Sequence, residues 1–342
     1  MADQLGLVEQ RARALAFRGG ARCELGDLGG LDDLREALAV TRELGSVREV
    51  AQVQAILAGV LWATDGPMAS KDAFEAGIEV AARRGITDMS MAIRSQLLGP
   101  LFDLGEWDRL LQTAEQVVGW FEARGGGYFE VVARTSSARV EVYRGLAPSV
   151  SSSDLVSLVR TIGDVQVLIP GLAVASLEEW RNGNRAAATA LVEELLQLTS
   201  DRSSWYLVPF APDLLRVCLR EDRLDLAQRV IDNLRDGARR NKLCVTTGRA
   251  LLEEAGRRYD VAARLYAEAA SGWGEFGSLL EQAFALWGEG RSLVELGTSD
   301  ASDRLQSAGD IFAAVGAGPP LVGFQPSLAP ASADLRAPSS SD

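Results

Sequence analysis

The side chains that most enzymes use for nucleophilic and acid–base chemistry are incompletely represented in this sequence. Histidine does not occur among the 342 residues, which excludes Ser-His-Asp and Cys-His nucleophile arrangements and the usual zinc sites. The run from Gly272 to Gly277 matches G-x-G-x-x-G, but a dinucleotide site needs a strand before the glycines and a helix after them. A helical stretch, 265–271, precedes them here, so we interpret these glycines as the end of a helical unit. The sequence also has no phosphate-binding G-x-x-x-x-G-K-[ST] loop.

An acidic cluster, Asp32-Asp33-Leu34-Arg35-Glu36, resembles a metal-binding motif of helical prenyl-diphosphate enzymes. Those enzymes need a second acidic motif on a facing helix, and the sequence shows none. We therefore interpret the cluster as a solvated helix face. The same interpretation applies to three carboxylate pairs: Glu178-Glu179, Glu193-Glu194 and Glu253-Glu254. No catalytic residue, cofactor or metal is expected, and a helical metal-dependent enzyme is the alternative.

Composition excludes several classes of partner. The net charge of −12 and the pI near 4.8 disfavour nucleic acid, which needs a basic surface, and an anionic membrane. The cysteines Cys23, Cys218 and Cys244 form no C-x-x-C pair, and the longest apolar stretch, 165–175, is too short to span a bilayer. Residues 1–4 lack the basic and apolar regions of a signal peptide. We therefore expect a soluble cytoplasmic protein.

Glycines recur at intervals of about 40 residues, and each interval is expected to hold one pair of helices. One row ends the second helix of a pair, because glycine accepts the left-handed conformation after a last turn. A second row makes the turn inside each pair. A third lies within first helices, where glycine costs about 1 kcal/mol against alanine, and is expected to allow close helix packing. These rows are Gly45, Gly85 and Gly125; Gly26, Gly66, Gly105 and Gly145; and Gly19, Gly59 and Gly99.

The positions between the glycines follow helical spacing. Apolar residues recur every three or four positions, as at Leu28, Leu31, Leu34 and Leu38, and no segment alternates with the period of two that marks a half-buried strand. The sequence therefore predicts an all-α protein, a right-handed α–α superhelix of about eight helix pairs over residues 1–316. Residues 317–342, rich in Pro, Ser and Ala, are expected to form a disordered tail.

Two departures from the regular pattern are expected. A long turn around Pro148 should leave the second helix of unit four short. Four further prolines fall within or at the start of first helices, which should kink or begin late because proline cannot donate the backbone hydrogen bond. They are Pro100, Pro170, Pro209 and Pro212.

Two arginines are candidate contacts for a partner. Arg94 and Arg134 lie 40 residues apart, so they occupy equivalent places on successive first helices. If that face is concave, they form a ladder that suits an acidic peptide, because guanidinium groups pair well with carboxylates. The alternative is an exposed edge with water as the partner. We expect a protein or peptide ligand, with no nucleic acid and no membrane.

The residues Gly256-Arg257-Arg258-Tyr259, with Tyr266 and Ala269 further on, resemble a tetratricopeptide repeat with one additional turn residue. Four stretches resemble the C-terminal helical region of large bacterial ATP-binding regulators, many of which have an N-terminal nucleotide-cyclase domain: 18–31, 100–107, 201–206 and 264–270. The resemblance covers about residues 7–316, without the cyclase and AAA-type ATPase domains. It implies a non-catalytic interaction or sensor region of a signalling protein. A detached remnant of a longer gene is the alternative.

The first helix is expected to be a weak end of the array. A solenoid needs a terminal unit with a polar outer side, whereas this helix has the apolar residues Leu5, Leu7, Val8, Leu15 and Phe17. In the resembling proteins further helical sequence would cover that side. We therefore expect fraying, or self-association through the uncapped N-terminal repeat.

Overall fold

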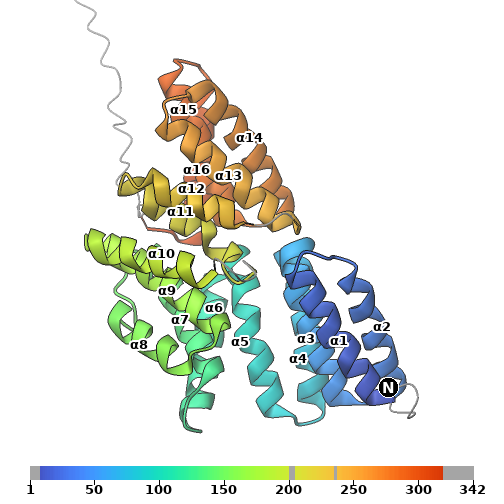
Figure 1. The fold of residues 1–342 in the computed structure, drawn as a ribbon. Helices are drawn as coiled ribbons and strands as arrows, with labels where there is room; N and C mark the ends of the chain where they lie inside the picture. Colours follow the sequence, from blue (N-terminus) through green and yellow to red (C-terminus); the bar gives the residue numbers. More distant parts are fainter. Residues whose placement is uncertain (1–7, 200–204, 235–236, 319–342) are drawn as a thin grey trace, which may run out of the picture.

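The computed structural model describes residues 8–199, 205–234 and 237–318. Within these residues the chain forms sixteen α-helices and no strand, which confirms the predicted all-α class (Figure 1). The helices follow one another as eight pairs. The hand of the superhelix stays a prediction, and most of the predicted tail, from residue 319 on, lies outside the described residues.

Each pair consists of a first and a second helix, and the first helices from α3 on contribute residues to the two cavities described below. The first helices are α1 (Val8–Glu24), α3 (Val47–Thr64), α5 (Thr87–Asp103), α7 (Tyr128–Tyr143), α9 (Val165–Arg181), α11 (Ala211–Arg220), α13 (Arg239–Ala255) and α15 (Leu279–Glu295). The second helices are α2 (Gly30–Glu43), α4 (Pro67–Arg83), α6 (Trp107–Glu122), α8 (Ser152–Ile162), α10 (Arg185–Thr199), α12 (Leu224–Asn233), α14 (Tyr259–Phe276) and α16 (Ala301–Val315). A short 3-10 segment, η2 (Val208–Phe210), precedes α11.

Glycines in the left-handed conformation make the turns where two of the three rows predict them. Their φ angles lie between 66° and 109° at Gly26, Gly45, Gly66, Gly85, Gly105, Gly125 and Gly145. In units six and seven the left-handed turn residue is not glycine but Asp222 (φ 55°) and Arg257 (φ 58°). Gly256, next to Arg257, has an ordinary φ of −76°. Arg257 therefore adopts a conformation that a side chain with a Cβ atom disfavours.

The third glycine row behaves differently at each position. A Cβ atom at Gly19 would lie 2.6 Å from the carbonyl oxygen of Gly30, so α1 and α2 approach closely, as predicted. A Cβ atom at Gly99 would meet the ring of Trp62 at 2.6 Å. At Gly59 no atom lies within 4 Å of that position, so the prediction of close helix packing there is wrong. The reason is that Gly59 faces a cavity.

The predicted short second helix of unit four and the late start at Pro209 and Pro212 are present, whereas a kink at Pro100 or Pro170 stays a prediction. The second helix of unit four, α8, has only 11 residues, and the Ser151 side chain caps it by accepting a hydrogen bond from the Asp154 amide. Unit six begins late, because Pro209 lies in η2 and Pro212 lies in the first turn of α11. Proline is accepted in a first turn, where its missing amide hydrogen would have no helical partner. Pro100 and Pro170 lie inside α5 and α9.

The array turns back on itself, so that helices α11 to α16 lie over the earlier units (Figure 1). α13 packs against α3. Tyr206 donates a hydrogen bond to Glu24 at 2.7 Å, and the Gly318 amide donates to the Tyr143 carbonyl at 3.0 Å. A Cβ atom at Gly66 would collide with the carbonyl oxygen of Phe276. The repeat pattern in the sequence did not predict this closure.

A buried ion pair lies at the contact between early and late units. Asp103, at the end of α5, pairs with Arg240 of α13, and the two residues are 4% and 3% exposed. Asp103 also accepts a hydrogen bond of 2.6 Å from Trp62 Nε1. The Arg240 guanidinium lies 4.4 Å from the Trp62 ring centroid, in the range of a cation–π contact. The contact between early and late units thus includes an ion pair to which each side contributes one charge.

Candidate functional site

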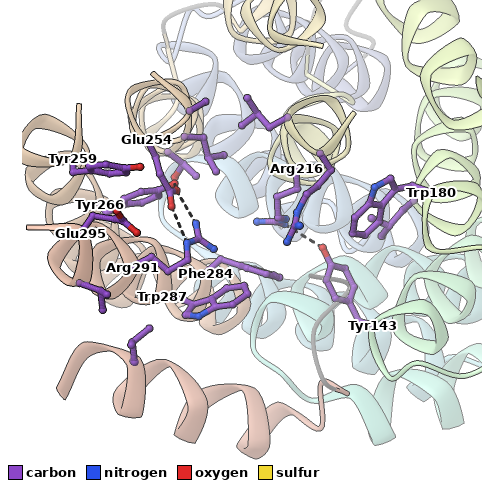
Figure 2. A pocket seen from close by; sticks show the side chains of 18 residues that line it. Tyr143, Trp180, Arg216, Glu254, Tyr259, Tyr266, Phe284, Trp287, Arg291 and Glu295 are labelled. Atoms are coloured by element: carbon purple, nitrogen blue, oxygen red, sulfur yellow. Dashed lines mark hydrogen bonds and ion pairs between the residues drawn. The ribbon is translucent and has the colours of Figure 1, made fainter. Parts of the chain in front are cut away.

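A cavity of about 530 Å³ opens on the surface that the first helices form in the C-terminal half of the array (Figure 2). Its walls come from the first helices of five consecutive units, α7, α9, α11, α13 and α15, with additions from α14 and α16. The volume is within the range of small-ligand pockets, about 300–1,000 Å³. We call this space the arginine–aromatic cavity. The lining residues that matter below are Tyr143, Trp180, Arg216, Arg220, Glu254, Tyr259, Tyr266, Phe284, Trp287, Arg291, Val294 and Glu295.

Helical periodicity explains why one face of each helix lines the cavity. On α15 the lining residues Phe284, Trp287 and Arg291 are three and four positions apart, a spacing that places side chains on the same side of a helix. Edge-to-face packing of Trp287 against Phe312 of α16, with centroids 6.2 Å apart, holds that ring in place. Tyr143 and Trp180 lie on the other side of the opening (Figure 2). Six of the eighteen lining side chains are therefore aromatic.

One side of the cavity contains a fully formed ion pair. Arg291 donates two hydrogen bonds to the Glu254 carboxylate, at 2.8 and 2.7 Å, and the Tyr266 hydroxyl donates to the same carboxylate at 2.6 Å. Burial opposes the charge of Arg291, but Glu254 raises the pKa of Arg291 above its ordinary value. Burial raises the pKa of Tyr266 well above 10, so its hydroxyl stays a donor. Both oxygens of the Glu254 carboxylate therefore already accept hydrogen bonds within the protein.

A second set of charges lies beneath the cavity and links three first helices. Arg216 pairs with Glu281 at 2.8 Å and with Asp213 at 2.7 Å, and Arg139 of α7 pairs with Asp213 at 2.7 Å. Burial opposes the charge of Asp213, but Arg139 and Arg216 lower the pKa of that carboxyl. The Tyr143 hydroxyl also donates to Asp213. These four charged residues, Arg139, Asp213, Arg216 and Glu281, are the buried charge network.

Arg220 lies one helical turn beyond Arg216 on α11 and lines the same cavity. Its electrostatic situation is the opposite of that of its neighbours. Burial, followed by repulsion from Arg291, lowers the pKa of Arg220, and the attraction of Glu254 offsets this only in part. The cavity therefore disfavours the charge of Arg220 while it favours the charges of Arg216 and Arg291. A negatively charged group bound nearby would reverse that penalty.

A second cavity, of about 240 Å³, lies on the first-helix surface of the earlier units. Gly59, Trp62 and Tyr128 are among its lining residues, and the segment 205–210 covers it. That segment is held in place by Arg139, whose Nη2 donates to the Pro209 carbonyl at 3.1 Å and whose guanidinium lies 4.6 Å from the Phe210 ring centroid. The segment therefore forms part of the wall of the second cavity, and the arginine–aromatic cavity is the larger of the two.

The two arginines predicted to contact a partner lie outside both cavities. Arg94 and Arg134 are on α5 and α7, neighbouring first helices that pack together, as their spacing predicted. Arg134 is engaged by Glu130 at 2.7 Å and Glu122 at 3.2 Å. The Nε atom of Arg94 is buried without a hydrogen-bond partner in the described part of the chain. Their role in partner binding stays a prediction.

Sequence reasoning missed Arg216, Arg220 and Arg291. The signal was present as two pairs at helical spacing on first helices, Arg216 with Arg220 on α11 and Trp287 with Arg291 on α15. It could not be recognised, because the same spacing also describes an ordinary solvated face. Which face of a first helix points inward depends on how the pairs stack.

The acidic cluster on α2 is only partly a solvated face. Asp33 is 7% exposed and accepts hydrogen bonds from Arg18 at 2.6 and 2.9 Å and from Arg22 at 2.9 Å. These hydrogen bonds, from Arg18 first, lower the pKa of Asp33 to about 2. The interpretation as helix surface is therefore wrong for Asp33, because its position faces α1, and holds for Asp32, whose side chain is 82% exposed.

The paired glutamates need a similar correction. Glu178 is 5% exposed, and Glu254 lines the cavity, so neither is ordinary helix surface. Adjacent residues of a helix point about 100° apart, so one glutamate of each of these two pairs faces inward. Glu193 and Glu194 stay part-exposed, with side chains 43% and 34% exposed. Within the described residues, no three or more acidic or cysteine side chains gather where they could hold a metal ion.

The glycine run 272–277 lies at the end of α14, where Gly277 is the left-handed cap with a φ of 92°. This confirms that these glycines close unit seven. Cys23, Cys218 and Cys244 are buried free thiols. None of the described helices combines the length and apolar character needed to cross a bilayer.

A comparison with protein-family models finds none that matches the chain, and a comparison with curated proteins finds no match either. The class of protein is therefore defined by the fold and the site together. Over the residues that the structure describes, the chain is an all-α array of eight helix pairs, with an arginine–aromatic cavity lined mainly by first helices.

Proposed function

We propose that this chain is a non-catalytic regulatory module that binds a segment of a partner protein on the surface formed by its first helices. The observation that carries the proposal is the arginine–aromatic cavity, which five consecutive first helices build together. At its rim the lining residue Val294 is 55% exposed. The apolar lining of the cavity is therefore open to a chain that passes over its rim.

The charges in the cavity favour binding over catalysis. Arg291 neutralises the Glu254 carboxylate, which also accepts a hydrogen bond from Tyr266, whereas a general base must present a free lone pair to its substrate. The alternative of a helical metal-dependent enzyme has no support from the position of Asp33, whose carboxylate two arginines already bind. The net charge of −12 supports a partner other than nucleic acid.

The resemblance to the C-terminal region of bacterial ATP-binding regulators supports the same role. In a regulator of that kind, a helical array that binds a partner would transmit the binding event to the catalytic domains. The chain would then act as the sensor part, in the cytoplasm, without a cofactor of its own. The alternative of a detached remnant differs in one respect, since a remnant would have no partner.

Site-specific photo-cross-linking tests the proposal. A benzophenone amino acid at Val294 places the reactive group at the rim, and the same amino acid at Leu44, which is 47% exposed beyond the end of α2, is the matched control. In cells that produce the chain, we expect one discrete cross-linked protein from Val294 and none from Leu44. The same products from both positions, or none from either, would contradict the proposal. No product from either position would favour the remnant.

A further inference from the structure

The second cavity, between the early units and the segment 205–210, combines part-exposed aromatic rings with an open interior. Trp62, Tyr128 and Phe210 are half-buried and line it from α3, α7 and the end of η2. Its volume of about 240 Å³ is below the range of about 300–1,000 Å³ that is typical of pockets for drug-sized ligands. The space therefore suits a small molecule of one or two rings better than a peptide segment.

Gly59 keeps part of this cavity open. It lies inside α3, and no atom lies within 4 Å of the position that its Cβ atom would take. A glycine inside a helix costs about 1 kcal/mol relative to alanine, and no close approach of a neighbouring helix compensates for that cost here. At Gly99, by contrast, the Trp62 ring packs against the bare backbone, since a Cβ atom would meet it at 2.6 Å. The missing side chain of Gly59 therefore leaves room for a ligand beside the lining rings.

The described lining residues of the second cavity offer no unmatched charge to a ligand. They include no aspartate, glutamate or lysine. The two lining arginines are 5% and 3% exposed, and each is paired with a carboxylate, Arg139 with Asp213 and Arg240 with Asp103. Taking a charged group out of water without a counter-charge is costly. The cavity therefore favours a neutral ligand over an anion or a cation.

Uncharged hydrogen-bonding groups line the same space. Gln96 and Gln166 are exposed, and Ser136 is half-buried. The side-chain oxygen of Gln166 accepts a hydrogen bond from the Tyr128 hydroxyl at 2.8 Å, so its NH₂ group is the part that can donate to a ligand. The Ser136 hydroxyl donates to the Val132 carbonyl at 2.9 Å, so its oxygen is the part that can accept from a ligand. These groups match the oxygen and the N–H of an amide.

We propose that the second cavity binds a neutral aromatic small molecule of one or two rings that carries an amide-like pair of hydrogen-bonding groups. The ring packs among Trp62, Tyr128 and Phe210. Arg139 holds the Phe210 side of the cavity in place, and a wall that is already formed lowers the cost of ordering on binding. This site shares no described lining residue with the arginine–aromatic cavity. It goes beyond the proposed function and does not depend on it.

A series of indoles that differ in charge tests this chemistry. The probes are indole-3-carboxamide, indole-3-carboxylate and indole-3-methylammonium, which keep the ring system and change the charge. Binding to the full, isotope-labelled chain is followed through the indole N–H resonance of Trp62, with that of Trp287 in the arginine–aromatic cavity as the internal reference. We expect the carboxamide to bind about tenfold more tightly than either charged probe, and to shift the resonance of Trp62 but not that of Trp287.

Variants at helical glycines locate the binding site. Gly59→Leu should weaken the binding of the carboxamide about tenfold or more, because the leucine side chain would occupy the open space in the cavity. Gly119→Leu is the matched control and should leave binding unchanged. Gly119 also lies inside a helix, α6, with no atom within 4 Å of a Cβ position, but it is exposed and outside the cavity. Gly59→Ala fills less space and should weaken binding less. Helicity and the unfolding temperature show whether each variant is folded.

Four results would each overturn the inference. They are no binding of the carboxamide up to about 10 mM, equally tight binding of either charged probe, a shift of the Trp287 resonance as large as that of Trp62, and unchanged affinity in a folded Gly59→Leu variant. The charge series and the two resonances use the unaltered chain, so they decide the matter even if Gly59→Leu does not fold. Loss of the cross-link at Val294 would remove the proposed function and leave this inference in place.

Discussion

Arg240 of α13 and Asp103 of α5 form a buried ion pair although 137 residues separate them along the chain. Trp62 of α3 takes part through its hydrogen bond to Asp103 and its contact with the guanidinium. One site therefore joins units two, three and seven. Removing one charge of a buried pair leaves the other without compensation, and this is more costly than the pair itself is favourable.

Asp103→Asn is accordingly expected to lower the free energy of unfolding by about 3–5 kcal/mol, because the Arg240 charge would stay buried without its counter-ion. Urea unfolding followed by circular dichroism measures the change. Asp108→Asn is the control, since Asp108 pairs with Arg144 while 93% exposed, and should cost less than about 1 kcal/mol. Equal effects would mean that the buried pair does not hold the closure.

Arg257→Gly should stabilise the chain by up to about 1 kcal/mol, because Arg257 has a left-handed φ of 58° that glycine accepts without a steric penalty. Gly45→Ala is the reverse experiment. Gly45 has a φ of 66° and no neighbouring atom within 4 Å of a Cβ position, so the substitution should cost about 1 kcal/mol through the backbone alone. Thermal unfolding of the three proteins tests both signs.

Gly19 and Gly59 should respond differently to alanine. Gly19→Ala should destabilise the chain by about 1–3 kcal/mol, because the new Cβ atom would press on the Gly30 carbonyl oxygen. Gly59→Ala should be neutral or stabilising by up to about 1 kcal/mol, since alanine favours the helix and the position is open. Destabilisation at both positions would show that the second cavity is filled in solution.

Acid should weaken the first helix pair through Asp33. Hydrogen bonds from Arg18 and Arg22 lower the pKa of Asp33 from 3.8 to about 2. A carboxyl with a depressed pKa contributes stability that is present above its unfolded pKa and is lost as the pH falls through the folded value. The difference in unfolding temperature between the unaltered chain and Asp33→Asn should therefore be constant above about pH 5 and shrink as the pH falls to about 2. Asp32→Asn, at an exposed position, should show no such trend.

The first helix should also be the site of self-association. Val8 and Phe17 of α1 are 46% and 53% exposed, and exposed apolar side chains favour contact between copies. Sedimentation at increasing concentration should show oligomers for the unaltered chain and fewer for Phe17→Ser. Substitution of the exposed Met68, on α4, is the comparison, and an equal reduction there would argue against α1 as the contact.

The turns and pair boundaries could be predicted from sequence because each depends on a local requirement. The chain reverses at Gly45 and Gly105 with a positive φ. Because glycine accepts this conformation best, the turns appear in the sequence as regularly spaced glycines. The exceptions were Asp222 and Arg257, which adopt a left-handed φ without being glycine, and Gly256 beside Arg257 is misleading. The short α8 was predictable for the same local reason, from the turn around Pro148.

The site could not be predicted because it depends on relationships between distant units. Arg139 contacts Asp213 across 74 residues, and nothing in the period of one unit says which of its faces meets another unit. Arg94 and Arg134 were chosen on a correct alignment of neighbouring helices, yet the cavity lies elsewhere, beside α11 and α15. The position of the cavity depends on how far the late units fold back onto the early ones, and this is set by the packing of all the helix pairs together.

The return of late units onto early ones has a consequence for folding. In an open solenoid each repeat touches its neighbours alone, so units can fray or be deleted one by one with additive effects. Here the pairing of Asp103 with Arg240 and of Glu24 with Tyr206 adds contacts of long sequence separation, which slow folding because long loops must close first. The chain should therefore unfold more nearly as one cooperative body than as a row of modules. Deleting unit seven would expose the protein's second and third units to hydrogen exchange, even though several helix pairs separate them in sequence.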